Sequence, residues 1–307
     1  MSAAEFRALM DEVSNAGRWG DADQRGTLNY LTAEHTRAAA QLVRSGERIS
    51  LELPLVKEYA ADTQFPVQHH MVVMGEPQPG QIDPRQIWTG DWFAIQSHGY
   101  IHSHIDALSH SLFDGEMYNR RTLAAITAQG ATSHTIESAQ TGIVTRGVLL
   151  DIPRLRGVEY LDLGSPILPE ELDAAEAAQG VRVGEGDVLL VRTGRHQRRA
   201  AHGPWDPERD GAAGLHASTA RWLHQRHLVA LGGDLSTDVL PSGVAECPEP
   251  MHALALVAMG LHLLDNLWLE DLALACAREN RWEFMLAIAP LRLPGGTASP
   301  INPIAVL

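Results

Sequence analysis

The chain has 307 residues, of which 45% are hydrophobic and 20% are charged, and this balance is typical of a folded globular protein rather than a disordered one. The formal net charge of −14 opposes binding to nucleic acid or to an anionic membrane surface, because both are bound through clustered Lys and Arg. Neither a long apolar run nor a signal-peptide pattern occurs, so we expect a cytoplasmic protein.

Four helices are predicted along the chain. Thr32 can cap the first, over residues 33–44. The second, over residues 169–180, begins with a proline and two glutamates, which suit the first turn of a helix, and ends at a glycine. The third and fourth are expected over about residues 218–226 and 249–264, where apolar residues recur at helical spacing.

Short apolar or alternating runs predict strands around these helices. They cover residues 49–56, 91–97, 147–152, 187–193, 228–233 and 285–289. Strands that alternate with helices indicate an α/β fold in which helices cover a sheet. No repeat, low-complexity tract or long polar linker divides the chain, so we expect a single domain over residues 1–307.

Histidines are dense directly after the strand-like run at residues 91–97. If the extended backbone continues, alternate side chains point to the same face. That face would present His98, Tyr100, His102, His104 and Asp106. Imidazole and carboxylate are the donors that Zn²⁺ and Mn²⁺ accept. Chance clustering is the better explanation for any single histidine, but the segment as a whole predicts a site for a divalent metal ion, Zn or Mn.

This segment resembles the signature of the putative cyclase family, which includes bacterial kynurenine formamidases and isatin hydrolases and reads His-x-Gly-Thr-His-x-Asp-x-Pro-x-His. His104, Asp106 and His110 match the last three anchors in register, and Leu108 replaces the proline. The resemblance implies that His104 and Asp106 bind the metal and that His110 is the catalytic acid/base residue. It also implies a mixed central β-sheet or small β-barrel flanked by helices, of the swivelling β/β/α type, and association into a homodimer or tetramer.

The first anchor of the signature departs from the family pattern. Strict register places Tyr100 at the ligand position, whereas a loop longer by two residues, as in the longer family members, places His98 there. We therefore take His98 as the first choice of ligand and His102 as the second. Tyr100 and His102, with Trp92 and His70, are expected to contact the substrate, and solvent exposure is an equal alternative for His70.

A second metal-binding segment is implied near the end of the chain. His252, followed by residues 260–267, resembles the family segment in which a His precedes a Glu by about three helical turns. Asp265 takes the place of that Glu, one residue further on, so the resemblance implies His252 and Asp265 as further ligands. The alternatives are a helix histidine on an apolar face and an aspartate that ends a helix. His262 is expected to be structural or exposed.

The predicted ligands suit hydrolysis. A divalent ion with an open coordination position lowers the pKa of a bound water to about 7, and His110 would move the proton to the leaving group. We therefore predict a metal-dependent hydrolase that cleaves an amide, formamide, cyclic imide or amide, or lactone. The alternatives are a lyase or cyclase that uses the ion as a Lewis acid, and a non-catalytic small-molecule binding protein. The substrate depends on loops such as residues 58–88, whose course does not follow from the sequence.

Overall fold

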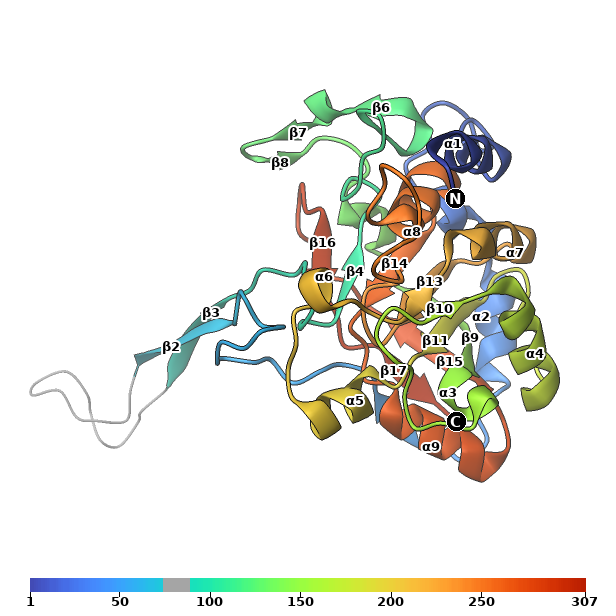
Figure 1. Ribbon diagram of the computed structural model, residues 1–307. Helices are drawn as coiled ribbons and strands as arrows, with labels where there is room; N and C mark the ends of the chain where they lie inside the picture. Colours follow the sequence, from blue (N-terminus) through green and yellow to red (C-terminus); the bar gives the residue numbers. More distant parts are fainter. Residues whose placement is uncertain (74–88) are drawn as a thin grey trace, which may run out of the picture.

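The apolar runs of the sequence form the middle of a sheet in the computed structural model, which describes residues 1–73 and 89–307 (Figure 1). Within those residues the sheet has nine strands in the order β1-β17-β15-β9-β11-β13-β14-β4-β16. The four central strands are parallel: β9 (Ile143–Asp151), β11 (Val188–Arg192), β13 (Ala230–Gly233) and β14 (His262–Asp265). The predicted α/β class is confirmed. Of the two predicted architectures, a mixed central sheet and a small β-barrel, the structure has the mixed sheet.

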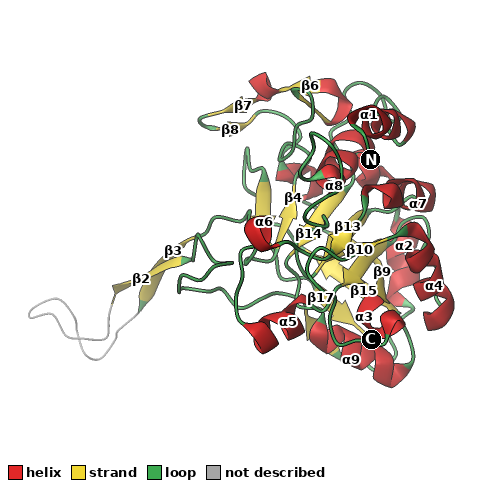
Figure 2. Ribbon diagram, in the orientation of Figure 1, coloured by secondary structure: helices red, strands yellow, loops and turns green. Residues whose placement is uncertain are grey.

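Antiparallel strands flank the parallel block on both sides. On one side lie β15 (Glu283–Ile288), β17 (Ile304–Val306) and β1 (Arg48–Ser50). On the other side lie β4 (His104–Asp106) and β16 (Ala298–Pro300). Strands β11, β13 and β14 are buried along their whole length because helices cover the sheet (Figure 2), which explains their nearly continuous apolar sequences.

Nine α-helices are assigned in the described part of the chain, and three of the four predicted ones are among them. Their bounds are α1 (Ala3–Glu12), α2 (Ala33–Ala40), α3 (Ile152–Arg156), α4 (Pro169–Gln179), α5 (Arg195–His202), α6 (Pro207–Asp210), α7 (Ala220–Arg226), α8 (Pro250–His252) and α9 (Glu270–Glu279). Short 3-10 turns lie at Gly26–Tyr30, Tyr118–Arg120, Leu123–Ala125, Ile136–Ala139 and Ala217–Thr219. In these residues no helix has both the length and the hydropathy needed to cross a bilayer.

The fourth predicted helix, over residues 249–264, is wrong in its second half. Helix α8 continues as a π-helix, Ala253–Met259, and ends at Gly260, whose φ of 65° lies in the left-handed region that favours glycine. Residues 262–265 then form β14, because they pair with β13 on one side and with β4 on the other. Asp265 therefore lies at the end of a buried strand, not of a helix.

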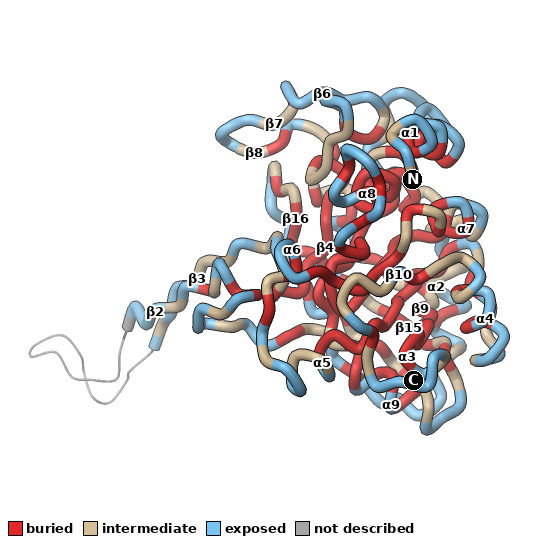
Figure 3. Tube along the Cα trace, in the orientation of Figure 1, coloured by how far each residue is buried: buried red, intermediate tan, exposed pale blue. Residues whose placement is uncertain are grey.

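The predicted strand at residues 91–97 is also shorter than expected. It forms β3 (Gly90–Ala94), which pairs with β2 (Gln68–Val73) in an arm that projects from the body of the protein (Figure 1). The arm is largely exposed, in contrast to the buried sheet (Figure 3). Of the predicted loop at residues 58–88, residues 74–88 lie outside the described part of the chain. Small two-stranded sheets complete the fold: β5 (Glu116–Met117) with β6 (Arg121–Thr122), β7 (Ile126–Thr127) with β8 (Gly130–Ala131), and β10 (Pro166–Ile167) with β12 (Gly214–Leu215).

Candidate metal centre

Strand β4 brings the first two predicted ligands together. His104 and Asp106 are two residues apart on an extended strand, so their side chains share a face. The distance between His104 Nε2 and Asp106 Oδ1 is 3.5 Å, and both side chains are buried. The other ring nitrogen of His104, Nδ1, lies 2.8 Å from the carbonyl oxygen of His102, which holds the ring with Nε2 facing the carboxylate.

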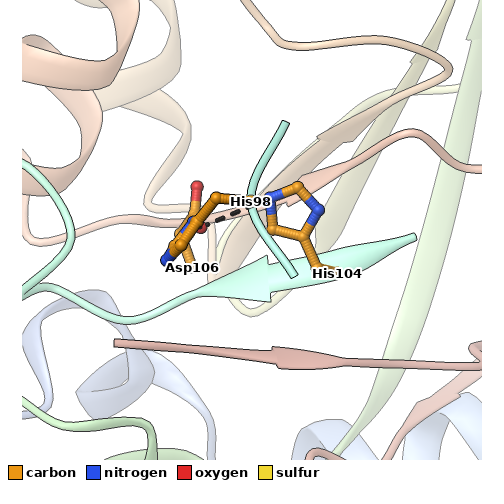
Figure 4. Close-up of side chains that lie close together, drawn as sticks. All are labelled: His98, His104 and Asp106. Atoms are coloured by element: carbon orange, nitrogen blue, oxygen red, sulfur yellow. Dashed lines mark ion pairs between the residues drawn. The ribbon is translucent and has the colours of Figure 1, made fainter. Parts of the chain in front are cut away.

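His98 reaches the same carboxylate through a bend in the backbone. Its Nδ1 lies 3.0 Å from Asp106 Oδ1 (Figure 4), and its Nε2 lies 3.1 Å from Thr297 Oγ1. Gly99, with a φ of 114°, turns the chain directly after His98. The expectation that an unbroken strand aligns residues 98–106 is therefore wrong, because β3 ends at Ala94 and β4 begins only at His104.

The structure does not bring His102 to this carboxylate. Its Nδ1 lies 3.0 Å from the carbonyl oxygen of Gln96, and its Nε2 is buried without a hydrogen-bond partner. Burial lowers the pKa of His102, which favours the neutral ring. Tyr100 is partly buried against the apolar cluster that includes Trp205 and Leu240. Burial raises the pKa of the Tyr100 phenol, which therefore remains protonated and able to donate a hydrogen bond.

The two predicted substrate-binding residues from the arm lie together. His70 is on β2 and Trp92 is on β3, and their rings stack with centroids 5.6 Å apart. About half of the Trp92 surface is exposed, at 48%. Both residues therefore belong to the projecting arm formed by β2 and β3 (Figure 1).

The second predicted segment meets the first at Asp106. His252 Nε2 lies 3.6 Å from Asp265 Oδ2 and 3.9 Å from Asp106 Oδ2. Asp265 pairs with His104 in the register between β14 and β4, which explains why a residue so distant in sequence lies here. Burial lowers the pKa of His252, but hydrogen bonds with Asp238 and Asp265 outweigh it and raise that pKa well above its ordinary value.

Asp238, in the loop after β13, supports His252. Its carboxylate is fully buried, and Oδ2 lies 2.6 Å from His252 Nδ1. The backbone N–H groups of Met251 and His252 also donate to it, at 2.6 and 3.2 Å. Asp238 thus holds the start of α8 and directs His252 Nε2 toward the candidate ligands, as carboxylates that support metal-binding histidines do.

Two sets of donors share Asp106. The first is His98, His104 and Asp106, the second is Asp106, His110 and His252, and within each set the donor atoms lie within 4.8 Å of one another. Both oxygens of Asp106 are buried without a hydrogen-bond partner. Burial raises its pKa, but the imidazoles of His110, His104 and His98 outweigh burial, and the net pKa is below the ordinary value. A carboxylate and several imidazoles that converge in a buried site are donors that fit Zn²⁺ or Mn²⁺.

His110 completes the cluster beside the candidate ligands. Its ring stacks on that of His98 with centroids 3.7 Å apart, and the ring of His252 is 6.1 Å away. Burial lowers the pKa of His110 to about 4, although the Asp106 carboxylate raises it. The ring is therefore neutral near pH 7 and has a nitrogen free to accept a proton.

Comparisons with known proteins point to one family. Residues 49–239 match the model of the family described as putative cyclase. A crystal structure described as a novel cyclase is 32% identical, with a TM-score of 0.87 over 97% of this chain and 99% of its own. Isatin hydrolase A from Labrenzia aggregata is 21% identical, with a TM-score of 0.59 over 87% and 94% of the two chains. Isatin hydrolase A from Ralstonia solanacearum is 20% identical, with a TM-score of 0.58 over 89% and 95%. No curated protein matches the chain.

Proposed function

The chain belongs to the putative cyclase family, and from this premise we propose that it is a metal-dependent hydrolase of small molecules. Its substrates would be amides, formamides, cyclic imides or amides, or lactones. One observation carries the proposal: the Asp106 carboxylate is buried, lies 3.0 Å from the His98 imidazole, and is shared by two sets of imidazoles. Solved structures with the same fold include isatin hydrolases, which supports hydrolysis over non-catalytic binding.

The ligands in this proposal are His98, His104 and Asp106, with His252 and Asp265 on the far side of the same carboxylate. A bound Zn²⁺ or Mn²⁺ would supply Lewis acidity to a water and to the substrate carbonyl. The protein positions these ligands rigidly, since His104 is held by the His102 carbonyl and His252 by Asp238. Rigid donors stabilise developing charge without reorganising during the reaction.

His110 is the proposed acid/base residue. It is neutral near pH 7 because burial lowers its pKa to about 4, so it can take a proton from the attacking water. The protonated ring would lie beside the Asp106 carboxylate, which favours its positive charge, and would then give the proton to the leaving nitrogen or oxygen. Tyr100, which packs against Trp205 and Leu240, would contact the rest of the substrate.

A substrate panel in labelled water tests the proposal. Purified protein is analysed for metal and assayed with N-formyl aromatics, cyclic imides and lactones in water enriched in oxygen-18. Hydrolysis predicts turnover that a chelator abolishes and a product that carries the label. Turnover without label would instead identify a lyase or cyclase, and bound metal without turnover on any substrate would favour a binding protein.

We also propose that the chain forms a homo-oligomer. The arm exposes Met71, Val72, Trp92 and Phe93, with exposed fractions from 46% to 67%. A two-stranded hairpin is marginally stable alone in water, and adjacent strand residues point to opposite faces, so apolar side chains exposed on both faces of the arm favour its burial against a partner. Sedimentation equilibrium tests this: a dimer or tetramer is expected, and a monomer at micromolar concentration would contradict it.

A further inference from the structure

The segment between His98 and His104 has no regular secondary structure, yet it must set the distance between two candidate ligands. Residues 99–103 bend between the end of β3 and the start of β4. The carbonyl of His102 also orients the His104 ring. Any freedom in this bend would move both imidazoles relative to Asp106, so its anchoring bears directly on the proposed centre.

Asn266 anchors this bend from the neighbouring strand. It directly follows Asp265 at the end of β14, and it is fully buried. Its side-chain amide donates to the carbonyl oxygens of Gly99, at 2.7 Å, and of His102, at 3.1 Å. The backbone carbonyl of Asn266 accepts a hydrogen bond from Ser103 Oγ at 2.6 Å. Three contacts from one residue therefore fix both ends of the bend.

A buried guanidinium sets the orientation of the Asn266 amide. Arg195 Nη1 lies 3.5 Å from Asn266 Oδ1, and Arg195 Nη2 lies 3.3 Å from Asp62 Oδ2. The buried Asp62 carboxylate also pairs with Arg199, at 2.6 Å, so the two arginines share it. Because a guanidinium only donates and a carbonyl only accepts, the amide must place its oxygen toward Arg195 and its N–H groups toward the bend.

We propose that Asn266 is a positioning residue that sets the geometry between His98 and His104 and thereby the affinity of the metal centre, an inference that rests on the proposed function. Its backbone φ of 57° lies in the left-handed region, which asparagine adopts more readily than most residues. An aspartate would have nearly the same shape but no N–H group. The carboxylate oxygen in the place of Nδ2 would then face the carbonyl oxygens of Gly99 and His102, and the bend would lose two of its three hydrogen bonds to this residue.

Asn119 provides a matched control. It has the same φ of 57°, and its amide likewise donates to backbone carbonyls, those of Gly20, Asp21 and Asp23, at 3.1 to 3.3 Å. None of the candidate ligands lies in that loop. Asn119→Asp therefore repeats the chemical change of Asn266→Asp away from the proposed centre.

The test is a zinc titration of the metal-free proteins against a chromophoric chelator, together with thermal unfolding of each metal-free protein. We expect Asn266→Asp to raise the dissociation constant for Zn²⁺ by about 10- to 100-fold, as loss of a residue that supports metal ligands does. Asn119→Asp should bind Zn²⁺ as the wild type does, even if its melting temperature falls. The visible spectrum of the Co²⁺-loaded protein should change in Asn266→Asp alone, because the ligand geometry changes.

Asn266→Gly gives a second variant, since glycine tolerates the positive φ and removes the amide without adding charge. It should weaken zinc binding in the same direction. A folded Asn266 variant with wild-type zinc affinity and Co²⁺ spectrum would overturn the proposal, as would failure of both variants to fold, because that would give Asn266 a general structural role. A wild-type protein that binds no zinc, manganese or cobalt would instead overturn the proposed function itself.

Discussion

The two sets of donors around Asp106 are assembled in different ways. In the first set, His98 and His104 belong to the same short segment as Asp106. In the second set, His110 also belongs to that segment, but His252 arrives on α8, and its neighbour Asp265 is placed by the pairing of β14 with β4. The first set depends on a local bend and a three-residue strand. The second depends on the whole order β13-β14-β4 and on Asp238. The contrast implies that changes in the first set affect the centre alone, while changes in the second set also affect the fold.

The largest effect is expected at the residue that both sets share. Asp106→Asn removes the negative charge, so neither set can balance a divalent cation. The purified variant should hold no stoichiometric metal after dialysis, and activity should be lost with it. Elemental analysis and assays with added Zn²⁺ or Mn²⁺ measure this. Full metal content in the variant would show that the two sets do not meet at Asp106.

His110→Ala separates chemistry from metal binding within the first segment. The variant should keep the wild-type metal content and lose about 10²- to 10⁴-fold in kcat, which is the usual contribution of a general acid/base. Elemental analysis and steady-state kinetics on the same preparation provide both values. Loss of metal together with rate would instead make His110 a ligand of the second set.

His134 lies outside both sets and tests the fold alone. It is fully buried, and burial, with a smaller contribution from Arg121, lowers its pKa to about 4. The folded state then binds fewer protons than the unfolded state, whose histidine pKa is about 6.5. The contribution of His134 to the free energy of unfolding is therefore full above a pH of about 6.5. It falls by roughly 3 kcal/mol as the pH drops toward about 4.

Urea unfolding of the metal-free protein between these pH values checks this prediction. His134→Gln should show a shallower loss of stability with falling pH than the wild type, and unchanged zinc affinity at pH 7. Equal slopes in the two proteins would show that His134 titrates normally in the folded state.

The smallest effect addresses the contrast itself. Asp238→Asn should weaken zinc binding by about 10- to 100-fold, because His252 loses its charged partner. It should also lower the unfolding free energy of the metal-free protein by about 1–3 kcal/mol. His98→Ala, in the first set, should weaken zinc binding but change that free energy by less than about 1 kcal/mol, since the side chain is 27% exposed. Equal losses of stability in the two variants would contradict the contrast.

The same contrast explains what could be predicted from the sequence. His104, Asp106 and His110 follow from a motif whose spacing stays fixed along one segment. His98, the first choice of metal ligand, lies beside Asp106. The turn at Gly99 brings it there, and not the alternation of side chains along a strand. A single sequence offers little signal for that turn beyond the glycine itself.

The second set could be predicted only in part. Asp265 was expected at the end of a helix because the apolar run of residues 249–264 has helical spacing, and only Gly260 hinted at the break that lets β14 form. The roles of Asp238 and Asn266 depend on contacts between distant segments, which a pattern in the sequence does not contain. The usable signal is that Asp238 follows β13 at the carboxyl end of a parallel strand, where α/β proteins place their sites.

Anomalous diffraction at the absorption edge of the metal found in the purified protein tests the central claim most directly. We predict a peak among the side chains of His98, His104 and Asp106, and no peak there in crystals of Asp106→Asn. Active, metal-containing crystals in which the peak lies elsewhere would contradict the account.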